Sequence, residues 1–361
     1  MAQYEGLLKK HQPDYQGLID NILRKGTPRR VYHMELFHDQ EIRTAIAARF
    51  DLMKGVGRDC PDYNLKEIIA VNRFIGWDYV CASLDVGLQF HNVTTDDTAE
   101  LARDKGRTFR DEHVGPVTNW EQFEKYPWPN INTPSATKTL EFLQENLPDD
   151  MCICGFTGHF AEELSWLPGY ETLCYMLFEQ PDLVHAIADK LMEYYHQTVV
   201  KMLQFDKVKL MWATDDMGFK TGLLISPGDT RKYVLPGHSM LADMSHQAGI
   251  PYLLHSCGML DDIMPDLIND VKIDAKHSFE DTIEDVRDAK RKYGKQIALI
   301  GGLDIDFLCR SDEQAIRQRV RQTLDACMPG GGYCLGTGNS VANYIPLENY
   351  LAMVDEGRLY A

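Results

Sequence analysis

The stretch Ile250-Pro251-Tyr252-Leu253-Leu254-His255-Ser256-Cys257-Gly258 is an apolar run that ends in an imidazole, a thiol and a glycine. Its length, its composition and the flanking Pro251 and Gly258 predict a buried strand. Because residues i and i+2 of a strand share a face, we expect His255 and Cys257 to point the same way. Imidazole and thiolate are the donors that zinc prefers, so the end of this strand is a candidate metal site.

A catalytic zinc site needs three protein ligands and one open position. The sequence offers Cys334, in the glycine-framed segment Gly330–Gly338, as the third ligand. Buried cysteines are also common in protein cores, and a histidine at a strand end often serves only as a hydrogen-bonding group. A purely structural role for His255 and Cys257 therefore stays open at this point.

Seven other segments have the length and composition of buried strands: Arg30–Phe37, Trp77–Leu84, Met151–Phe156, Val208–Thr214, Val271–Glu280, Gln296–Asp304 and the segment around Cys334. Helical patterns separate them, most regularly after residue 137. Repeated strand–helix units imply parallel strands with crossover helices, and eight such units close into a barrel. We predict an α/β fold, a (β/α)8 TIM barrel spanning residues 1–361 as one domain, with residues 1–30 as an N-terminal helical extension covering the barrel bottom.

Polar residues gather at or just after the carboxyl ends of these predicted strands, where barrels of this kind build active sites. The set comprises Glu35, Asp85, Asp215, Asp216, His255, Cys257, His277, Glu280, Asp304 and Cys334. Acidic residues in this position often cap the next helix, which is the role we expect of Asp216 and Asp304. Glu35, Asp85 and His277 are candidate catalytic residues. The stretch 89–129 has little apolar periodicity, so we expect it to pass over the barrel mouth.

The composition excludes several classes of partner. The chain carries 37 Lys and Arg against 54 Asp and Glu, a net charge of −17, which repels nucleic acid and anionic membrane surfaces. The start lacks the pattern of a signal peptide, and no apolar run is long enough to span a bilayer. The nine cysteines are dispersed, as in a reducing compartment. We expect a soluble, cytoplasmic protein.

A family resemblance rests on four stretches, Leu254–Gly258, Thr221–Pro227, Ile300–Asp304 and Gly330–Tyr333. Through them the chain resembles the uroporphyrinogen decarboxylase superfamily, and within it the cobalamin-dependent, zinc-containing methyltransferases. The resemblance extends over nearly the whole chain.

The resemblance also implies a set of metal ligands. The zinc motif of the coenzyme M methyltransferases is similar to His-x-Cys followed distantly by Cys, and His255, Cys257 and Cys334 match it residue by residue. In cobalamin-independent methionine synthase, a more distant barrel relative, a Glu ligand follows the His-x-Cys motif. Glu280 stands near the corresponding place, which makes it a candidate fourth ligand.

This resemblance implies a zinc enzyme that moves a methyl group between a corrinoid (cobalamin) and a small thiol or methylated substrate. The corrinoid would be carried by a separate partner protein docking near the stretch 89–129, because the chain shows no corrinoid-binding segment. The direction of transfer stays open. Decarboxylases of the superfamily hold substrate carboxylates with an Arg-Gln-x-Gly-Arg segment, whereas this chain has His33–Asp39 there.

Two other functions remain possible at this stage. One is a decarboxylase-like lyase that acts on a carboxylated substrate through Asp85, with His255 and Cys257 as core residues. The other is a non-catalytic barrel whose thiols only bind metal. Metal content would separate the first alternative from the methyltransferase, and methyl transfer would separate the second.

Overall fold

A sheet of seven parallel strands forms the centre of the computed structural model, which describes residues 4–360. In spatial order its strands are β1 (Tyr79–Ala82), β4 (Cys152–Thr157), β5 (Val208–Thr214), β8 (Tyr252–His255), β9 (Ala275–His277), β10 (Ala298–Ile300) and β11 (Tyr333–Cys334). The spatial order follows the chain order, and each strand pairs in parallel with the next. The chain must therefore return outside the sheet after every strand, which gives the (β/α)8 TIM-barrel architecture that the sequence predicts.

The eighth position of the barrel is filled by residues 31–38, and here the predicted strand Arg30–Phe37 is wrong. On the side of β11, this segment makes only isolated parallel bridges, His33 to Leu335 and His38 to Val341. On the side of β1, the backbone of this segment is held by the Tyr79 side chain. The Tyr79 hydroxyl accepts a hydrogen bond from the backbone N–H of Glu35 at 2.9 Å and donates to the backbone carbonyl of Glu35 at 2.7 Å. A tyrosine thus takes the place of a strand ladder.

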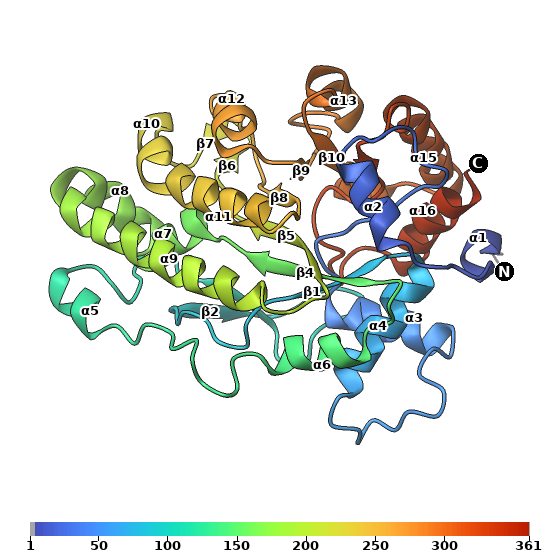
Figure 1. The fold of residues 1–361 in the computed structure, drawn as a ribbon, viewed down its shortest axis with the longest axis horizontal. Helices are drawn as coiled ribbons and strands as arrows, with labels where there is room; N and C mark the ends of the chain where they lie inside the picture. Colours follow the sequence, from blue (N-terminus) through green and yellow to red (C-terminus); the bar gives the residue numbers. More distant parts are fainter. Residues whose placement is uncertain (1–3, 361) are drawn as a thin grey trace.

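Helices lie around the sheet (Figure 1). Those on the barrel wall are α3 (Gln40–Arg49), α4 (Tyr63–Ile75), α6 (Lys138–Asn146), α7 (Phe160–Trp166), α8 (Tyr170–Glu179), α9 (Pro181–Met202), α10 (Pro227–Asp229), α11 (Leu235–Gln247), α12 (Met264–Asp266), α13 (Val286–Tyr293), α14 (Ile305–Arg310), α15 (Glu313–Cys327) and α16 (Leu347–Leu359). Two π-helical turns, Thr230–Val234 and Leu267–Val271, adjoin α11 and α12. Within residues 4–360 we find no helix with the length and apolar character needed to cross a lipid bilayer.

The N-terminal extension is helical only in α1 (Glu5–Leu8) and α2 (Tyr15–Ile22), and residues 1–3 of the predicted extension lie outside the described residues. Helix α1 packs against α16, so the two ends of the chain lie close together (Figure 1). Asn21 of α2 accepts a hydrogen bond from the Gly332 nitrogen, just before β11 begins. Helix α2 therefore covers the amino end of the barrel.

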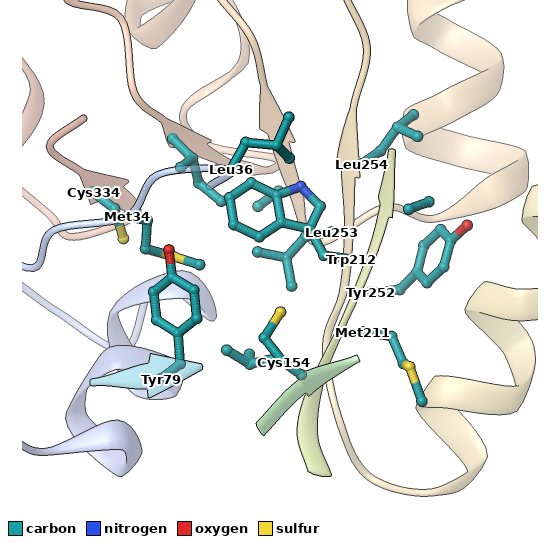
Figure 2. Close-up of a cluster of buried hydrophobic side chains, with 14 of the residues drawn as sticks. Met34, Leu36, Tyr79, Cys154, Met211, Trp212, Tyr252, Leu253, Leu254 and Cys334 are labelled. Atoms are coloured by element: carbon teal, nitrogen blue, oxygen red, sulfur yellow. The ribbon is translucent and has the colours of Figure 1, made fainter. Parts of the chain in front are cut away.

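The barrel interior is packed with large apolar side chains. Figure 2 shows Trp212 among Leu36, Tyr79, Cys154 and Leu253, which come from different sides of the barrel. Trp212, Tyr79 and Leu253 are fully buried. The interior is thus a solid core, and only the ends of the strands are free to build a site.

Two β-hairpins stand outside this barrel sheet. The first, β2 (Asn92–Thr95) with β3 (Arg107–Arg110), belongs to the stretch 89–129 together with α5 (Trp120–Lys125). It is joined to the loop after β11, since the Asn343 amide donates to Asp97 at 2.7 Å and Arg107 donates to Asn343. The second hairpin, β6 (Gly218–Phe219) with β7 (Gly222–Leu223), follows the end of β5. Both hairpins lie at the carboxyl end of the barrel.

Candidate metal centre

Three potential metal ligands converge at the carboxyl ends of β5 and β8. Donor atoms of Asp216, His255 and Cys257 all lie within 4.8 Å of one another, and they are the only such group of His, Cys, Asp and Glu in residues 4–360. The Nε2 atom of His255 lies 3.1 Å from Asp216 Oδ1 and 3.6 Å from Cys257 Sγ. The prediction that His255 and Cys257 point the same way is confirmed.

The local backbone explains this convergence. Strand β8 ends at His255, which pairs with Thr214 on one side and His277 on the other. Cys257 then turns over the strand end, and its backbone N–H donates to Asp216 Oδ1 at 2.9 Å. Gly258 has a φ of +85°, and a Cβ at this position would lie 2.1 Å from the backbone of Gly218. A glycine is therefore required where the β6–β7 hairpin crosses the site.

The charges of the cluster would favour a bound cation. Burial raises the pKa of the Cys257 thiol, and the Asp216 carboxylate raises it further. Burial alone would also raise the pKa of Asp216, but the hydrogen bond and charge of His255 and the N–H of Cys257 hold it well below its usual range. The thiol thus keeps its proton beside a carboxylate, and a bound metal cation would reverse this preference.

Of the predicted catalytic residues, His277 lies directly behind the cluster. Its Nδ1 is 2.7 Å from His255 Nδ1, and its Nε2 is 3.2 Å from the carbonyl oxygen of Thr337. Trp212 packs edge-on against its ring. Burial lowers the pKa of His277 well below its ordinary value, and His255 adds to this effect. His277 contacts a candidate ligand rather than the mouth of the barrel.

Glu35 lies one step further back. Its carboxyl group contacts the Thr337 nitrogen through both oxygens at 2.9 Å and the Thr337 hydroxyl at 2.6 Å. Burial raises the pKa of Glu35 to about 8, although the hydrogen bonds from Thr337 lower it. The Thr337 hydroxyl also lies 2.6 Å from the Asn339 carbonyl oxygen, and because it has one hydrogen, it can donate to Glu35 or to Asn339 but not to both at once.

Asp85 and Glu280 do not join the three donors. The exposed carboxylate of Asp85 accepts hydrogen bonds from the Thr139 nitrogen at 2.9 Å and the Thr139 hydroxyl at 2.6 Å, which caps the start of α6. Glu280 stands at the rim, where its negative charge adds to the rise in the pKa of the Cys257 thiol. Asp304 caps α14 by accepting from the Phe307 nitrogen, as predicted.

Cys334, which the sequence predicted as the third ligand, does not lie with His255 and Cys257. Its Sγ lies 3.4 Å from the Asn21 side chain of α2, at the amino end of the barrel, and Figure 2 shows it beside Met34 in the apolar interior. Strand β11 has only two residues, so the chain needs several more residues after Cys334 to reach the mouth. Asn339 arrives there instead, with its Nδ2 3.0 Å from Cys257 Sγ.

Sequence reasoning missed two residues of the site. Asp216 was expected to cap a helix, but the hairpin β6–β7 follows it and its carboxylate turns to His255. The adjacent Asp215 takes the capping role, since it accepts hydrogen bonds from the first turn of α7. The position of Asp216 after a strand was the available signal. Asn339 gave none, because asparagine is common in loops.

A cavity of about 730 Å³ adjoins the centre. Asn339 connects the two, since it lines the cavity and contacts Cys257. Charged side chains on the cavity wall are Lys220, Glu280, Asp281, Asp304, Asp306 and Arg310. Phe219, which is 62% exposed on the β6–β7 hairpin, and Tyr344, which is 47% exposed, stand nearby. None of the three candidate ligands lines this cavity, but the Asp216 side chain is 40% exposed, so the centre is open to solvent on that side.

Comparisons with known proteins agree with this architecture. Residues 106–360 match the family described as uroporphyrinogen decarboxylase (URO-D). Among solved structures, a methyltransferase from Methanosarcina mazei is similar over 96% of this chain and 98% of that chain, with 18% identity and a TM-score of 0.66. A putative vitamin-B12 independent methionine synthase from Listeria monocytogenes is similar over 92% and 96%, with 13% identity and a TM-score of 0.52. No curated protein sequence matches this chain.

At these identities the structural similarities establish a shared fold. The superfamily resemblance that the sequence suggested is confirmed by the family match. That match spans well over half of the 361 residues and includes all three candidate ligands, and the chain belongs to the uroporphyrinogen decarboxylase family.

Proposed function

We propose that this protein is a zinc-dependent methyltransferase. It moves a methyl group between a corrinoid, carried by a separate partner protein, and a small thiol or methylated substrate. The observation that carries the proposal is the convergence of Asp216, His255 and Cys257 beside an accessible cavity at the carboxyl end of the barrel. The similarity in fold to a methyltransferase from Methanosarcina mazei supports the same class of reaction.

The donor set fits zinc. One imidazole, one thiol and one carboxylate supply nitrogen, sulfur and oxygen, a mixture that zinc accepts and that magnesium or calcium does not favour. Three protein ligands leave one coordination position for a substrate, as in catalytic zinc sites. We therefore assign Asp216, His255 and Cys257 as the ligands, in place of the set with Cys334. When bound, zinc would act as a Lewis acid toward the sulfur, oxygen or nitrogen of the substrate.

The surrounding residues of the chain support this chemistry. Asn339 Nδ2 is placed to donate a hydrogen bond to Cys257 Sγ, and such a bond favours the thiolate form. Asp216 accepts the backbone N–H of Cys257 and so holds the turn after β8 in place. The substrate enters through the cavity, and Glu280 on its wall adds negative charge near the thiol.

The proposed corrinoid partner requires a docking surface beside the cavity. The exposed rings of Phe219 and Tyr344 offer apolar surface beside the cavity, which suits a bulky, partly apolar cofactor brought by another protein. The β2–β3 hairpin contacts the loop after β11 and extends this surface. We infer that the partner docks across these elements.

The lyase alternative receives less support. Four carboxylates line the cavity, Glu280, Asp281, Asp304 and Asp306, against two cations. One of these cations, Arg310, is already paired with Asp306 at 2.6 Å. Such a wall disfavours a carboxylated substrate, and Asp85, the expected lyase acid, caps a helix.

The test is methyl transfer itself. Purified protein, with and without zinc, would be mixed with methylcobalamin and a panel of small thiols, and loss of the methyl–cobalt absorption would be followed. The reverse assay would offer methylated amines, ethers and thioethers to cob(I)alamin. We expect zinc-dependent transfer in one direction, lost in Cys257→Ala and kept in Cys334→Ala. Zinc-independent release of carbon dioxide from a carboxylated substrate, without methyl transfer, would contradict the proposal.

A further inference from the structure

We propose that His277 is a positioning residue that fixes the proton of His255 on Nδ1 and thereby leaves His255 Nε2 free to bind the metal. The inference rests on the metal centre of the proposed function, but its test does not depend on methyl transfer. His277 itself contacts no substrate cavity and is fully buried.

The proton assignment follows from hydrogen-bond partners. His277 Nε2 faces the carbonyl oxygen of Thr337 at 3.2 Å, and a carbonyl can only accept, so His277 Nε2 carries a hydrogen. In a neutral imidazole the other nitrogen is then an acceptor. That nitrogen, His277 Nδ1, lies 2.7 Å from His255 Nδ1, which must therefore be the donor. His255 Nε2 is left to face Asp216 and Cys257.

The neutral form of His277 is favoured by its surroundings. The ring is 0% exposed, and its direct partners are a second imidazole, a carbonyl and the edge of Trp212. None of these contacts is a carboxylate. A charged imidazolium without a carboxylate partner is costly to bury, so His277 remains an acceptor toward His255.

The chain of contacts continues to Glu35. The Thr337 backbone supplies both ends of this link, because its carbonyl meets His277 and its N–H meets the Glu35 carboxyl group. The Thr337 hydroxyl adds a contact to Glu35 at 2.6 Å. Glu35 thus holds the carbonyl that orients His277, and the two predicted catalytic residues become successive supports of one ligand.

The consequence for metal binding has a known scale. Loss of a group that orients a histidine ligand typically weakens metal affinity or activity by about 10–100-fold. The amide of Asn is able to accept from His255 where His277 Nδ1 does, whereas Leu cannot. We therefore expect His277→Asn to keep most of the zinc affinity and His277→Leu to lose about 10–100-fold.

The first measurement is zinc affinity by competition with a chromophoric chelator. The matched control is His38→Leu, which also removes a buried imidazole, one that is stacked on Trp77 and bonded to Tyr350 rather than to the centre. This control should keep the wild-type zinc affinity even if it lowers thermal stability. Equal zinc affinity in His277→Leu and wild type would overturn the proposal, and so would equal losses in His277→Leu and His277→Asn.

The second measurement reads the protons directly. Nitrogen-15 NMR of histidine-labelled protein, assigned with the His255 and His277 variants, reports which ring nitrogen is protonated. We expect His255 Nδ1 to be protonated both before and after zinc is added, with only the Nε2 signal shifting on zinc addition. A neutral His255 protonated on Nε2 alone would refute the inference, even in protein that never binds zinc.

The two proposals can fail separately. Zinc-dependent methyl transfer with unchanged zinc affinity in His277→Leu would retain the proposed function and reject the role of His277. The expected proton positions and zinc affinities without any methyl transfer would retain the role of His277 and reject the methyltransferase.

Discussion

Cys257 and Cys334 are the same type of residue, and each follows or ends a strand of the same sheet, yet they lie in opposite surroundings. Cys257 stands at the carboxyl end of the barrel, where its Sγ is 3.6 Å from His255 Nε2 and 3.0 Å from Asn339 Nδ2. Cys334 is fully buried near the amino end, with Asn21 as its polar neighbour. Height along the barrel, and not the identity of the side chain, decides which thiol is available to a metal.

The largest expected effect tests this contrast directly. Cys257→Ala should lower the zinc content far below stoichiometric, because it removes the only thiol of the cluster. Cys334→Ala should keep its zinc and lose about 1 kcal/mol of unfolding free energy, a usual cost for a core substitution. Elemental analysis and chemical denaturation of both variants would measure the two effects. Loss of zinc from Cys334→Ala would contradict the assignment of Cys257 as the only thiol ligand.

The adjacent residues Asp215 and Asp216 provide a second comparison between a structural residue and a candidate ligand. Asp216→Asn should weaken zinc binding by roughly 10–100-fold, with little change in stability. Asp215→Asn should keep the zinc affinity but lose about 1–3 kcal/mol of unfolding free energy, because Asp215 caps α7 and lies 2.7 Å from the buried His238. Chelator competition and thermal denaturation would separate the two outcomes. The same zinc affinity in both variants would remove Asp216 from the ligand set.

A smaller effect is expected at Asn339, the residue that reaches the mouth where Cys334 does not. Asn339→Ala removes the hydrogen bond to Cys257 Sγ and should raise the pKa of that thiol in the metal-free protein. Reaction with a thiol reagent as a function of pH would show this as slower labelling of Cys257 near neutral pH. Cys257→Ala, which keeps the other eight cysteines, serves as the background control. Unchanged labelling would mean that Asn339 does not influence the thiol.

The last prediction concerns Glu35 and the pH dependence of stability. The pKa of Glu35 is raised to about 8 from an ordinary 4.5, so the unfolded chain loses this proton first as the pH rises. The stabilising contribution is therefore complete below about pH 4.5 and is lost progressively toward pH 8. Glu35→Gln does not titrate, so its unfolding free energy relative to wild type should increase between pH 5 and pH 8. A constant difference would show that Glu35 is ionised throughout.

Much of the fold could be predicted from the sequence because the barrel repeats one unit. The apolar run up to His255, framed by Pro251 and Gly258, forms β8, and the strand predicted over Val208–Thr214 forms β5 with the same bounds. The strand prediction for Arg30–Phe37 was wrong because the backbone there is held by the Tyr79 hydroxyl, a tertiary contact that composition does not reveal.

The site was harder to predict for a physical reason. Asp215, Asp216 and Asp304 all follow strands, and only the path of the chain after each one decides whether it caps a helix or turns to His255. Cys334 seemed suitable because its segment reads as a strand, but β11 ends after two residues. The reach of the loop from Cys334 to Asn339 depends on backbone geometry, which the sequence pattern does not contain.

The most direct test of the central claim is zinc X-ray absorption spectroscopy of the zinc-loaded protein. Assignment of Asp216, His255 and Cys257 as the ligands predicts one sulfur at about 2.3 Å from the zinc, with the remaining neighbours nitrogen or oxygen at about 2.0–2.2 Å. Substrate thiols would be left out of the sample, so that every sulfur comes from the protein. Two sulfur neighbours would contradict the account, because the second would have to come from Cys334 or another cysteine that the structure places away from the mouth.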